Sequence, residues 1–394
     1  MRELAAIHDL VDLVTEKQFA ADASELPYVG LEHIAPRSAV LDRIGSTEGI
    51  VGICNRFAAG DILFGKLRPN LRKCVQADRN GLCSTEILVL RPRYGHDPRF
   101  VAQIVRGEQV FRIAGSATEG TKMPRTSWGT LSKIRLFAPS LEEQRAIADV
   151  LDAVDAAIRE TEALIAKLKL LRLGLIHDLI GNDHPVSALR ELGRPGIPFV
   201  RTGPFGTTLQ GIAWQESGVP VVPIAALDDR GIVSSRLDFV SPADAAKLAS
   251  FAMREGDILF SRVADVGRCV VVTPEYDGWI MSSNLMRMTL DPDRAVPSFM
   301  RLVLSAHQDL RRQIRATVNA GGRDVINSAI LAGLRTPLPS LTEQRSVVST
   351  VKAVDETISA QEQTLGKRLV LRDGLRDDLL TGRVRVAIVA EAAA

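Results

Sequence analysis

One block of this sequence occurs twice, at positions two hundred residues apart. Residues 139–145 read PSLEEQR, and residues 339–345 read PSLTEQR. The similarity continues without a gap to residues 179 and 379, with eighteen identical positions among forty-one. A long repeat constrains the architecture before any local pattern does. Because the period is the size of a domain, the sequence predicts two similar halves in tandem rather than a solenoid.

Both copies predict a long helix. Ser140 and Ser340 suit the N-cap position, and a glutamate follows three places later in each copy (Glu143 and Glu343), as in a capping box. Apolar residues then recur at steps of four and three, which is typical of a coiled-coil seam rather than of a helix packed on its own domain. They are Ile147, Leu151, Val154, Ile158 and Ile165 in the first copy and Val347, Val351, Val354, Ile358 and Leu365 in the second, continued by Leu171, Leu175 and Leu179 and by Leu371, Leu375 and Leu379.

Chain connectivity favours an antiparallel pair of helices. About forty helical residues span about 60 Å, whereas a globule of the size available here is only about 40 Å across. Parallel helices would require the second globule to carry the chain back along a whole helix. We therefore expect an antiparallel coiled coil with one globule at each end and an internal two-fold relation between the halves.

The segments outside the helices predict α+β globules. Both contain the sequence GDILF, at residues 60–64 and 256–260, within short β-like runs that are separated by Gly and Pro. Further strands are predicted at 84–90 and 282–288, and helices at 99–113 and 298–314. The expected organisation is a first globule (1–138), a first long helix (139–182), a second globule (183–338), a second long helix (339–382) and a C-terminal tail (383–394).

Composition sets limits on the class of protein. A chain of 394 residues with 46% hydrophobic residues can form two or three domains. No apolar run approaches the length of a membrane span, and the start MREL has no signal-peptide segment, so we expect a cytoplasmic protein without a membrane. The net charge of +2 neither requires nor excludes a polyanionic partner. The spacing of Cys54, Cys74, Cys83 and Cys269 predicts neither a zinc site nor a disulfide framework.

Catalytic motifs do not stand out in the sequence. An amino-methyltransferase would carry an Asn/Asp-Pro-Pro-Tyr/Phe motif and a Gly-rich cofactor loop, and neither is found. Residues 115–122 have two glycines at P-loop spacing but lack the Gly-Lys-Ser/Thr ending. The histidines show no metal-ligand spacing. We expect a non-catalytic chain with no metal and no cofactor.

The order of globule and PSLxEQR helix, repeated once, resembles the specificity subunit of type I restriction–modification systems. The GDILF runs and the segments LPYVGLE at 26–32 and GPFG at 203–206 are also similar to that family. This resemblance covers almost the whole chain. It implies that the globules are target recognition domains, each reading one half of a split, asymmetric site in double-stranded DNA. It also implies that the helices act as a spacer that docks two methyltransferase (modification) subunits, with a motor-nuclease restriction subunit completing the enzyme.

Basic residues after the GDILF runs are the candidate DNA contacts. Lys and Arg contacts to phosphates supply affinity, and side chains in the grooves supply sequence selectivity. Any one of these residues could be a solvated surface charge, but their matched positions favour DNA. We expect Phe205 to be a core residue rather than a stacking one. The candidates are Lys66, Arg68, Arg72, Lys73, Lys122 and Arg125 in the first globule and Arg262, Arg268 and Arg323 in the second.

The residues after the capping glutamates are candidates for subunit docking. Capping does not explain Gln144, Arg145, Gln344 and Arg345, which lie where each globule meets its helix. The alternative is that they form hydrogen bonds between globule and helix. For the chain as a whole, the alternative function is a coiled-coil adaptor with two ligand-binding heads and no DNA role. Competition binding with mixed duplex DNA at varied salt would separate the two functions.

Overall fold

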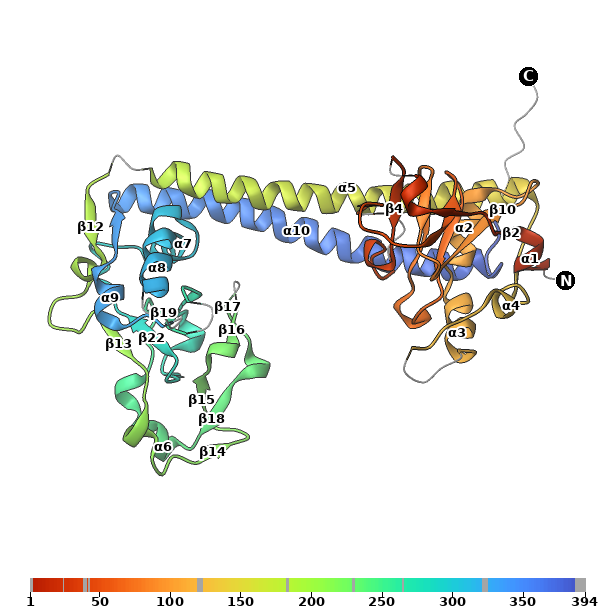
Figure 1. Cartoon of the computed structure of the whole chain (residues 1–394). Coiled ribbons are helices and arrows are strands. Elements are labelled where there is room, and N and C mark those ends of the chain that lie inside the picture. The colour runs from red at the N-terminus through yellow and green to blue at the C-terminus, as the bar shows by residue number, and fades with distance from the viewer. Residues whose placement is uncertain are drawn as a thin grey trace, which may run out of the picture. The chain divides into compact units, whose positions relative to one another are not determined.

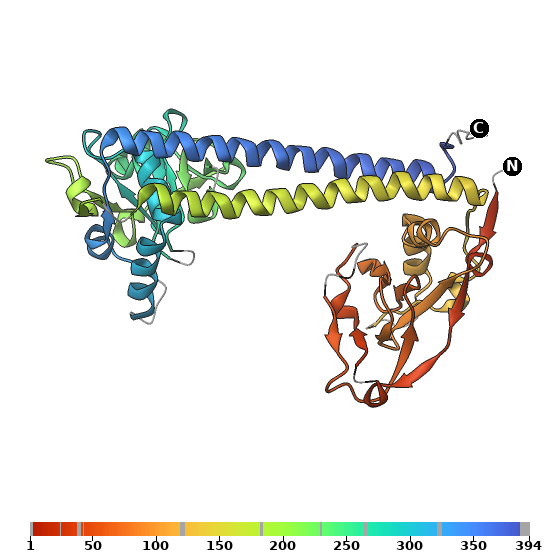
Figure 2. The ribbon, with the colours of Figure 1, turned by 90° about the horizontal axis from the view of Figure 1, so that it is seen from above.

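The chain divides into two compact units (Figures 1 and 2). The computed structural model describes residues 3–23, 25–37, 41, 43–118, 123–181, 184–228, 231–263, 266–320 and 325–386. Unit 1 consists of Met1–Glu162 and Gln363–Ala394, and unit 2 consists of Ala163–Glu362. Each unit therefore combines one globule with part of both long helices, α5 (Leu141–Ile180) and α10 (Leu341–Leu380).

The globule of unit 1 is built on two larger sheets. Its strands are β1 (Leu4–Ala6), β2 (Val11–Val14), β3 (Lys17–Phe19), β4 (Pro27–Val29), β5 (Gly45–Ser46), β6 (Ile53–Phe57), β7 (Ile62–Gly65), β8 (Cys74–Gln76), β9 (Gly81–Cys83), β10 (Ile87–Pro92) and β11 (Arg135–Phe137). One sheet has the order β2-β10-β7-β8, the second has the order β3-β6-β9-β4-β5, and β1 pairs with β11. The helices are α1 (Ile7–Leu10), α2 (Pro98–Val105), α3 (Glu108–Ser116) and α4 (Trp128–Leu131).

The globule of unit 2 repeats this framework with different details. Its strands are β12 (Val186–Ala188), β13 (Val200–Thr202), β14 (Trp214–Gln215), β15 (Val219–Val222), β16 (Leu227–Asp228), β17 (Gly231–Ile232), β18 (Asp238–Val240), β19 (Ile258–Ser261), β20 (Cys269–Val271), β21 (Ile280–Met281), β22 (Leu285–Met288) and β23 (Arg335–Pro337). The sheet β13-β22-β19-β20 corresponds to β2-β10-β7-β8, and the parallel pair β15–β21 corresponds to β4–β9. Its helices are α6 (Pro242–Lys247), α7 (Pro297–Ala306), α8 (Gln308–Ala320) and α9 (Ser328–Gly333).

The two GDILF runs form the same turn and the same buried strand. Gly60 and Gly256 adopt φ of 89° and 82°, a region that glycine enters without strain. The carboxylates of Asp61 and Asp257 each accept a hydrogen bond of 2.8 Å from the backbone N–H three residues earlier. The apolar residues that follow are fully buried in β7 and β19. The predicted strands are confirmed, and the glycine and aspartate of the motif are explained by the turn.

The single helix predicted after the strands is wrong in both globules, because each globule has two. In unit 1, Gly107 has an extended backbone (φ −63°, ψ 154°) and separates α2 from α3. In unit 2, His307 has φ −66° and ψ 121° and separates α7 from α8. Helices α2, α3, α7 and α8 each bury one apolar face. Because the apolar pattern continues across both breaks, the sequence did not indicate where one helix ends and the next begins.

In unit 1 the two long helices run antiparallel. The guanidinium of Arg376 on α10 bonds to the carboxylate of Asp155 on α5 at 2.9 Å. Arg368, two turns earlier on α10, donates to the carbonyl of Ala157 at 2.6 Å. Contact positions thus rise along α5 as they fall along α10, as antiparallel pairing requires. Within unit 1 the two helices lie side by side in both views (Figures 1 and 2).

The same direction holds within unit 2. Arg172 on α5 binds the carboxylate of Asp355 on α10, with one of its bonds at 3.1 Å. Lys169 forms an ion pair with Glu362 at 2.8 Å. The predicted α+β class with two globules and long antiparallel helices is confirmed. No helix in the described part of the chain is both long enough and apolar enough to cross a membrane.

The predicted seam is correct in its first half. Its extension is correct at Leu379 of α10, which is 4% exposed, and wrong at Leu171 and Leu371. Ile147, Leu151, Ile158 and Ile165 are buried, and so are Val347, Val351 and Ile358 of the second copy. In contrast, Leu171 is 57% exposed and Leu371 is 54% exposed. On α5 the buried positions shift instead to Ile176 and Ile180, which pack in the core of unit 2.

Candidate nucleic-acid interface

The turn between β7 and β8, residues 66–73, carries the largest group of predicted DNA contacts. We call it the basic turn of unit 1. It encloses a short 3-10 helix (Pro69–Leu71) and lies beside residues 124–126, through backbone bonds from Arg68 to Pro124 (2.8 Å) and from Thr126 to Lys66 (3.1 Å). Arg68 is exposed and Lys66 is half-buried. Among the described residues, neither side chain has an ion-pair partner.

Other candidates near this turn are already engaged within unit 1. Arg72 forms an ion pair with Glu108 at the start of α3. Arg125 forms one with Glu86 at 2.9 Å. Both guanidinium groups remain partly exposed, at 28% and 42% of the side chain. Their orientation is fixed by the protein, so any contact with DNA would use the N–H groups that these carboxylates leave open. Lys122 lies outside the described residues.

Lys73 and Arg268 occupy corresponding positions, and the side chain of each donates a hydrogen bond to a backbone carbonyl of its own globule. Lys73 Nζ donates to the carbonyl of Leu31 at 2.6 Å, and Arg268 donates to the carbonyl of Leu227 at 3.1 Å. Each cation thus ties the turn after the buried strand to the segment after the parallel strand β4 or β15. This contact gives both residues a structural role, whatever else they bind.

Arg262 begins the corresponding turn in unit 2. Its backbone bonds to Asn284 (3.1 Å) and Ile326 (3.0 Å) hold this residue between two loops. Its side chain is half-buried, and its Nε finds no hydrogen-bond partner among the described residues. Arg323 lies outside the described residues.

Phe205 corrects an expectation. It was predicted to be a core residue, but 65% of it is exposed. It lies after β13, at the N-cap of a short 3-10 helix (Gly206–Leu209). An exposed aromatic ring beside a β-sheet is suited to stacking on a base or to packing on a partner.

One surface residue near the basic turn was not found by sequence reasoning. Arg37 is exposed, and its backbone N–H donates to the carbonyl of Arg72 at 3.2 Å. It is separated from the basic turn by about thirty residues of sequence, and no charge cluster or periodic pattern marks it. Only the fold brings it there.

The buried strand, β7 in unit 1 and β19 in unit 2, has different contacts in the two units at the end that lies away from the basic turn. In unit 1, Arg91 binds Asp61 through two bonds of 2.8 Å. In unit 2, Thr289 donates to Asp257 at 2.7 Å and Arg287 stays 3.5 Å away. Burial raises the pKa of the Asp257 carboxyl and lowers that of the Arg287 guanidinium. A cavity of about 210 Å³ opens beside them, lined also by Arg194 and Arg254.

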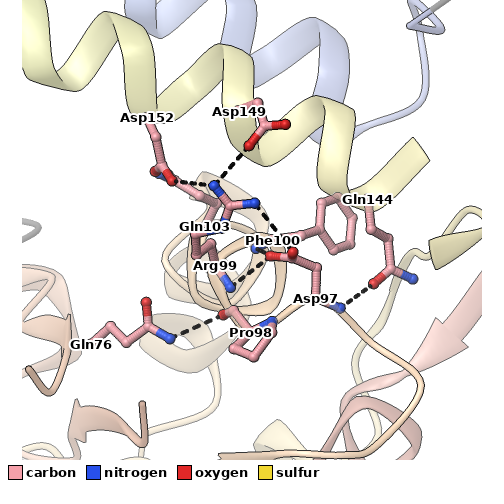
Figure 3. Close-up of polar contacts among 9 residues, drawn as sticks. All are labelled: Gln76, Asp97, Pro98, Arg99, Phe100, Gln103, Gln144, Asp149 and Asp152. Carbon is pink, nitrogen blue, oxygen red and sulfur yellow. Dashed lines mark hydrogen bonds and ion pairs between the residues drawn. The ribbon is translucent and has the colours of Figure 1, made fainter. Parts of the chain in front are cut away.

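Where the globule of unit 1 meets α5, arginine and carboxylate side chains form a network (Figure 3). Arg99 of α2 binds Asp149 at 2.8 Å and Asp152 at 3.2 Å, both on α5. It also approaches Asp97, the N-cap of its own helix, at 3.3 Å. Gln103, one turn further along α2, points to the same face of α5, 3.5 Å from Asp152.

The repeated glutamine connects helix and globule in both units. Gln144 accepts from the N–H of Asp97 at 3.0 Å and donates to the carbonyl of Pro139 at 2.8 Å. Gln344 accepts from the N–H of Val296 at 2.8 Å and donates to the carbonyl of Pro339 at 2.9 Å. Both side chains are buried, with 1% and 0% exposed. They form the globule-to-helix hydrogen bonds of the alternative interpretation and leave no surface for a docking partner.

The arginines that follow these glutamines, unlike the glutamines, lie on the surface. Arg145 and Arg345 are both exposed, and neither has an ion-pair partner among the described residues. Their role in docking stays a prediction. The preceding glutamates also differ from each other. The Ser340–Glu343 capping box is complete (2.8 and 3.4 Å), whereas the carboxylate of Glu143 turns away to Arg385 at 2.6 Å.

Comparison with known proteins agrees with this architecture. A family model described as the type I restriction modification DNA specificity domain matches residues 57–170. The type I restriction enzyme MjaVIII specificity subunit of Methanocaldococcus jannaschii is 20% identical over 69% of this chain and 67% of its own length. The StySPI specificity subunit of Salmonella potsdam is 21% identical over 77% of this chain and 68% of its own length.

Solved structures share the fold along nearly the whole chain. A chain from work on complex assembly and conformational transition of the type I R-M system aligns with a TM-score of 0.64 at 18% identity, covering 97% of this chain and 98% of that one. The S subunit from M. genitalium aligns with a TM-score of 0.57 at 15% identity, covering 96% of each. The resemblance to type I specificity subunits is thereby confirmed.

Proposed function

We propose that this chain reads a bipartite, asymmetric target in double-stranded DNA, with one half-site for each globule. One observation carries the proposal: the two globules share a framework but differ at the turn after the buried strand. Unit 1 places Lys66, Arg68 and Arg72 there, and unit 2 places Arg262. Two non-identical readers joined by helices of fixed length match a split, non-palindromic site. Sequence readout itself depends on side chains in the grooves.

The domain boundaries that we propose lie close to the ends of the two long helices. We take residues 1–138 and 183–338 as the two target recognition domains and 139–182 and 339–382 as the spacer helices, with 383–394 as a tail. The observed helices begin at Leu141 and Leu341, two residues after a proline in each case. A junction at residue 139 therefore leaves every bond of the helix cap intact in an exchanged chain.

Exchange of the first domain tests this function. Residues 1–138 are replaced with those of another specificity subunit, and the full chain is assembled with methyltransferase subunits. Mapping of methylated sites should then show one altered half-site and one unchanged half-site. The matched control exchanges residues 183–338 and should alter the other half. A change in both halves after either exchange contradicts independent readers.

Competition binding separates this function from that of a coiled-coil adaptor without a DNA role. Excess mixed duplex DNA should displace a labelled target only at low salt, because phosphate contacts release counterions and lose affinity as salt rises. An adaptor would bind no duplex at any salt concentration, and this result would exclude the DNA function.

We further propose that the long helices dock two methyltransferase subunits, with a restriction subunit joining them. The support is that matched positions of the two repeat copies are exposed: Arg145 and Arg345 at the helix starts, and Leu171 and Leu371 further along. Because the two repeat helices expose the same residue types at matched positions, each helix can bind one subunit of the same kind. Further apolar residues are exposed beside these leucines, Leu170 and Leu173 on α5 and Val370 on α10, and neighbouring exposed apolar residues mark interaction sites.

Mass measurement of the reconstituted complex tests the docking proposal. Two methyltransferase subunits for each chain are expected, and a stable one-to-one complex would count against it. Arg145→Glu and Arg345→Glu should each lower assembly affinity. Arg159→Glu, at another exposed position of α5, is the control and should assemble normally.

A further inference from the structure

Three arginines have an unusual backbone conformation. Among the described residues, only Arg37, Arg68 and Arg72 adopt a positive φ without being glycine, with φ of 63°, 48° and 55°. In this left-handed region the Cβ atom crowds the following carbonyl, so residues other than glycine are strained unless other contacts hold them. None of the three is an asparagine or aspartate, the residues that tolerate the region best.

The three strained residues lie together in unit 1. Arg68 and Arg72 flank the short helix Pro69–Leu71 of the basic turn. Arg37 reaches them through its N–H, which donates to the carbonyl of Arg72 at 3.2 Å. The N–H groups of Arg68 and Arg72 are bound as well, to Pro124 (2.8 Å) and Pro69 (2.9 Å). Each strained backbone is therefore held by a hydrogen bond, which also fixes the direction in which its side chain leaves the surface.

Unit 2 shows that the framework does not need arginine at such a position. The residues just before β8 and β20 correspond, because Phe64 pairs with Cys74 as Phe260 pairs with Cys269. Two residues before Cys269 stands Gly267, with φ 101°, where unit 1 has Arg72. Glycine satisfies the same kind of backbone without strain. Gly267 also has no room for a side chain, because a Cβ there would clash with the guanidinium of Arg311. Arg72 has room for its side chain, which binds Glu108.

The side chains of this cluster are available to a ligand. Arg37 and Arg68 are exposed and have no ion-pair partner among the described residues, whereas Arg72 is held by Glu108. A contact with a phosphate can be made by a lysine as a point charge or by an arginine through two N–H groups. A fixed direction matters for a bidentate contact with a base edge, where the guanidinium fork must meet two acceptors at once.

We propose that Arg37 and Arg68, with Arg72 holding the turn, each read a base edge in the half-site of unit 1. The chemistry fits the major-groove edge of guanine, which presents two acceptors to one guanidinium. Arg37 is then a specificity-determining residue that the sequence pattern does not show. This inference rests on the proposed DNA function and assigns the residues that carry selectivity in one of its two readers.

Selection from a randomised duplex pool tests the inference with the full chain assembled with methyltransferase subunits. Arg37→Lys and Arg68→Lys keep the charge and remove the fork. Each should reduce discrimination at one base pair of the unit 1 half-site by about tenfold and leave the other half-site unchanged. Arg79→Lys, at an exposed arginine in the turn between β8 and β9, should change nothing.

Glycine variants add a second measurement, the thermal midpoint, which should not fall when selectivity is lost. Arg37→Gly and Arg68→Gly relieve the left-handed strain, so the thermal midpoint of unit 1 should stay constant or rise while selectivity is lost. If these residues served only the fold, the midpoint would fall and selectivity would persist. That result would overturn the proposal.

The outcomes also separate this inference from the proposed function. If the unaltered chain selects a split sequence and the lysine variants select the same one, with affinity unchanged, the arginines do not read bases and the inference fails alone. The inference also fails if the glycine variants only lower the salt dependence of binding, by about one in log–log slope for each residue, because that is the signature of a phosphate contact. If the unaltered chain selects no sequence, the proposed function fails.

Discussion

The two units attach their globules to the long helices with the same backbone contact but different side-chain chemistry. In both, a buried glutamine binds the N–H at the start of the neighbouring helix, α2 or α7. Two residues after that N–H, unit 1 has Arg99 and unit 2 has Ser298. Four residues further on, unit 1 has Gln103 and unit 2 has Leu302, which is buried in an apolar core.

The residues of the long helices that face these positions also differ between the units. Asp152 of α5, which receives Arg99, corresponds to Lys352 of α10, which forms an ion pair along its own helix with Glu356 at 3.8 Å. Unit 1 therefore adds an ionic network to its apolar core, and unit 2 relies on the core and the glutamine. The two units thus share the hydrogen bond from the glutamine to the backbone, and they differ in the side chains that surround it. The two junctions should respond differently to charge removal, pH and salt.

Removal of the seam aspartate should produce the largest difference between the units. The side chain of Asp155 is 11% exposed and binds Arg376, whereas the side chain of the equivalent Asp355 is 39% exposed and binds Arg172. Asp155→Asn leaves a largely buried arginine without its counter-charge and should destabilise unit 1 by about 3 kcal/mol. Asp355→Asn breaks a more exposed pair and should cost unit 2 about 1 kcal/mol.

Hydrogen exchange during urea unfolding measures both losses, because it reports on each unit separately and the units need not unfold together. The two variants are matched controls for each other. Equal losses would show that burial does not distinguish the two seam pairs.

Replacement of the glutamine should affect both units equally. Gln144→Ala leaves the buried N–H of Asp97 and the carbonyl of Pro139 without partners. Gln344→Ala does the same to the part-buried N–H of Val296 and the carbonyl of Pro339, and each change should cost about 2 kcal/mol. Protection of α2 should fall in the first variant and protection of α7 in the second, as seen by hydrogen exchange. A clearly smaller loss in unit 1 would mean that its ionic network compensates for the missing amide.

The repeat made much of this fold predictable. The helix starts, their antiparallel direction and the GDILF strands follow from capping residues, apolar periodicity and chain length, which are properties of adjacent residues. For Gln144 and Gln344 the sequence left two roles open, subunit docking and hydrogen bonds to the globule, because their partners are backbone groups about fifty residues away. The repeat did mark both glutamines as residues that capping leaves unexplained.

The candidate interface was less predictable for a physical reason. The sequence indicated Arg68 and Arg72 through charge spacing, but Arg37 joins them only through a hydrogen bond between distant segments. Its left-handed backbone results from that tertiary contact and has no local pattern. The exposure of Phe205 was missed for a related reason: hydrophobic character predicts burial on average, yet it does not show which loops the fold leaves uncovered.

Acid should weaken unit 2 through a residue that unit 1 lacks. His307 is fully buried beside His177, at a ring-centroid distance of 5.8 Å, and stands where unit 1 has its Gly107 break. Burial lowers the pKa of His307, and the nearby Asp309 only partly opposes this. The folded state then binds a proton less readily than the unfolded state. Stability is complete above the ordinary histidine pKa of about 6.5 and falls as the pH drops below it.

The slope of this loss is at most about 1.4 kcal/mol per pH unit for one proton. Hydrogen exchange of α7 and α8 between pH 7 and pH 5 measures it. His307→Leu should remove the pH dependence of these helices. If the loss persists in that variant, another group is responsible.

The smallest expected effect tests whether the ionic network of unit 1 can be exchanged for the chemistry of unit 2. Arg99→Ser installs the residue that unit 2 has, and it should cost about 0.5–1 kcal/mol, because Arg99 is 42% exposed and its pairs with Asp149 and Asp152 are screened by water. Since the Debye length is only about 3 Å at 1 M salt, the difference between this variant and the parent chain should nearly vanish there. The reverse change, Ser298→Arg, should give no gain, because Lys352 stands where Asp152 would be needed. A gain from Ser298→Arg would mean that the arginine finds a partner other than its unit 1 equivalent, and the two junctions would then differ in geometry as well as in charge.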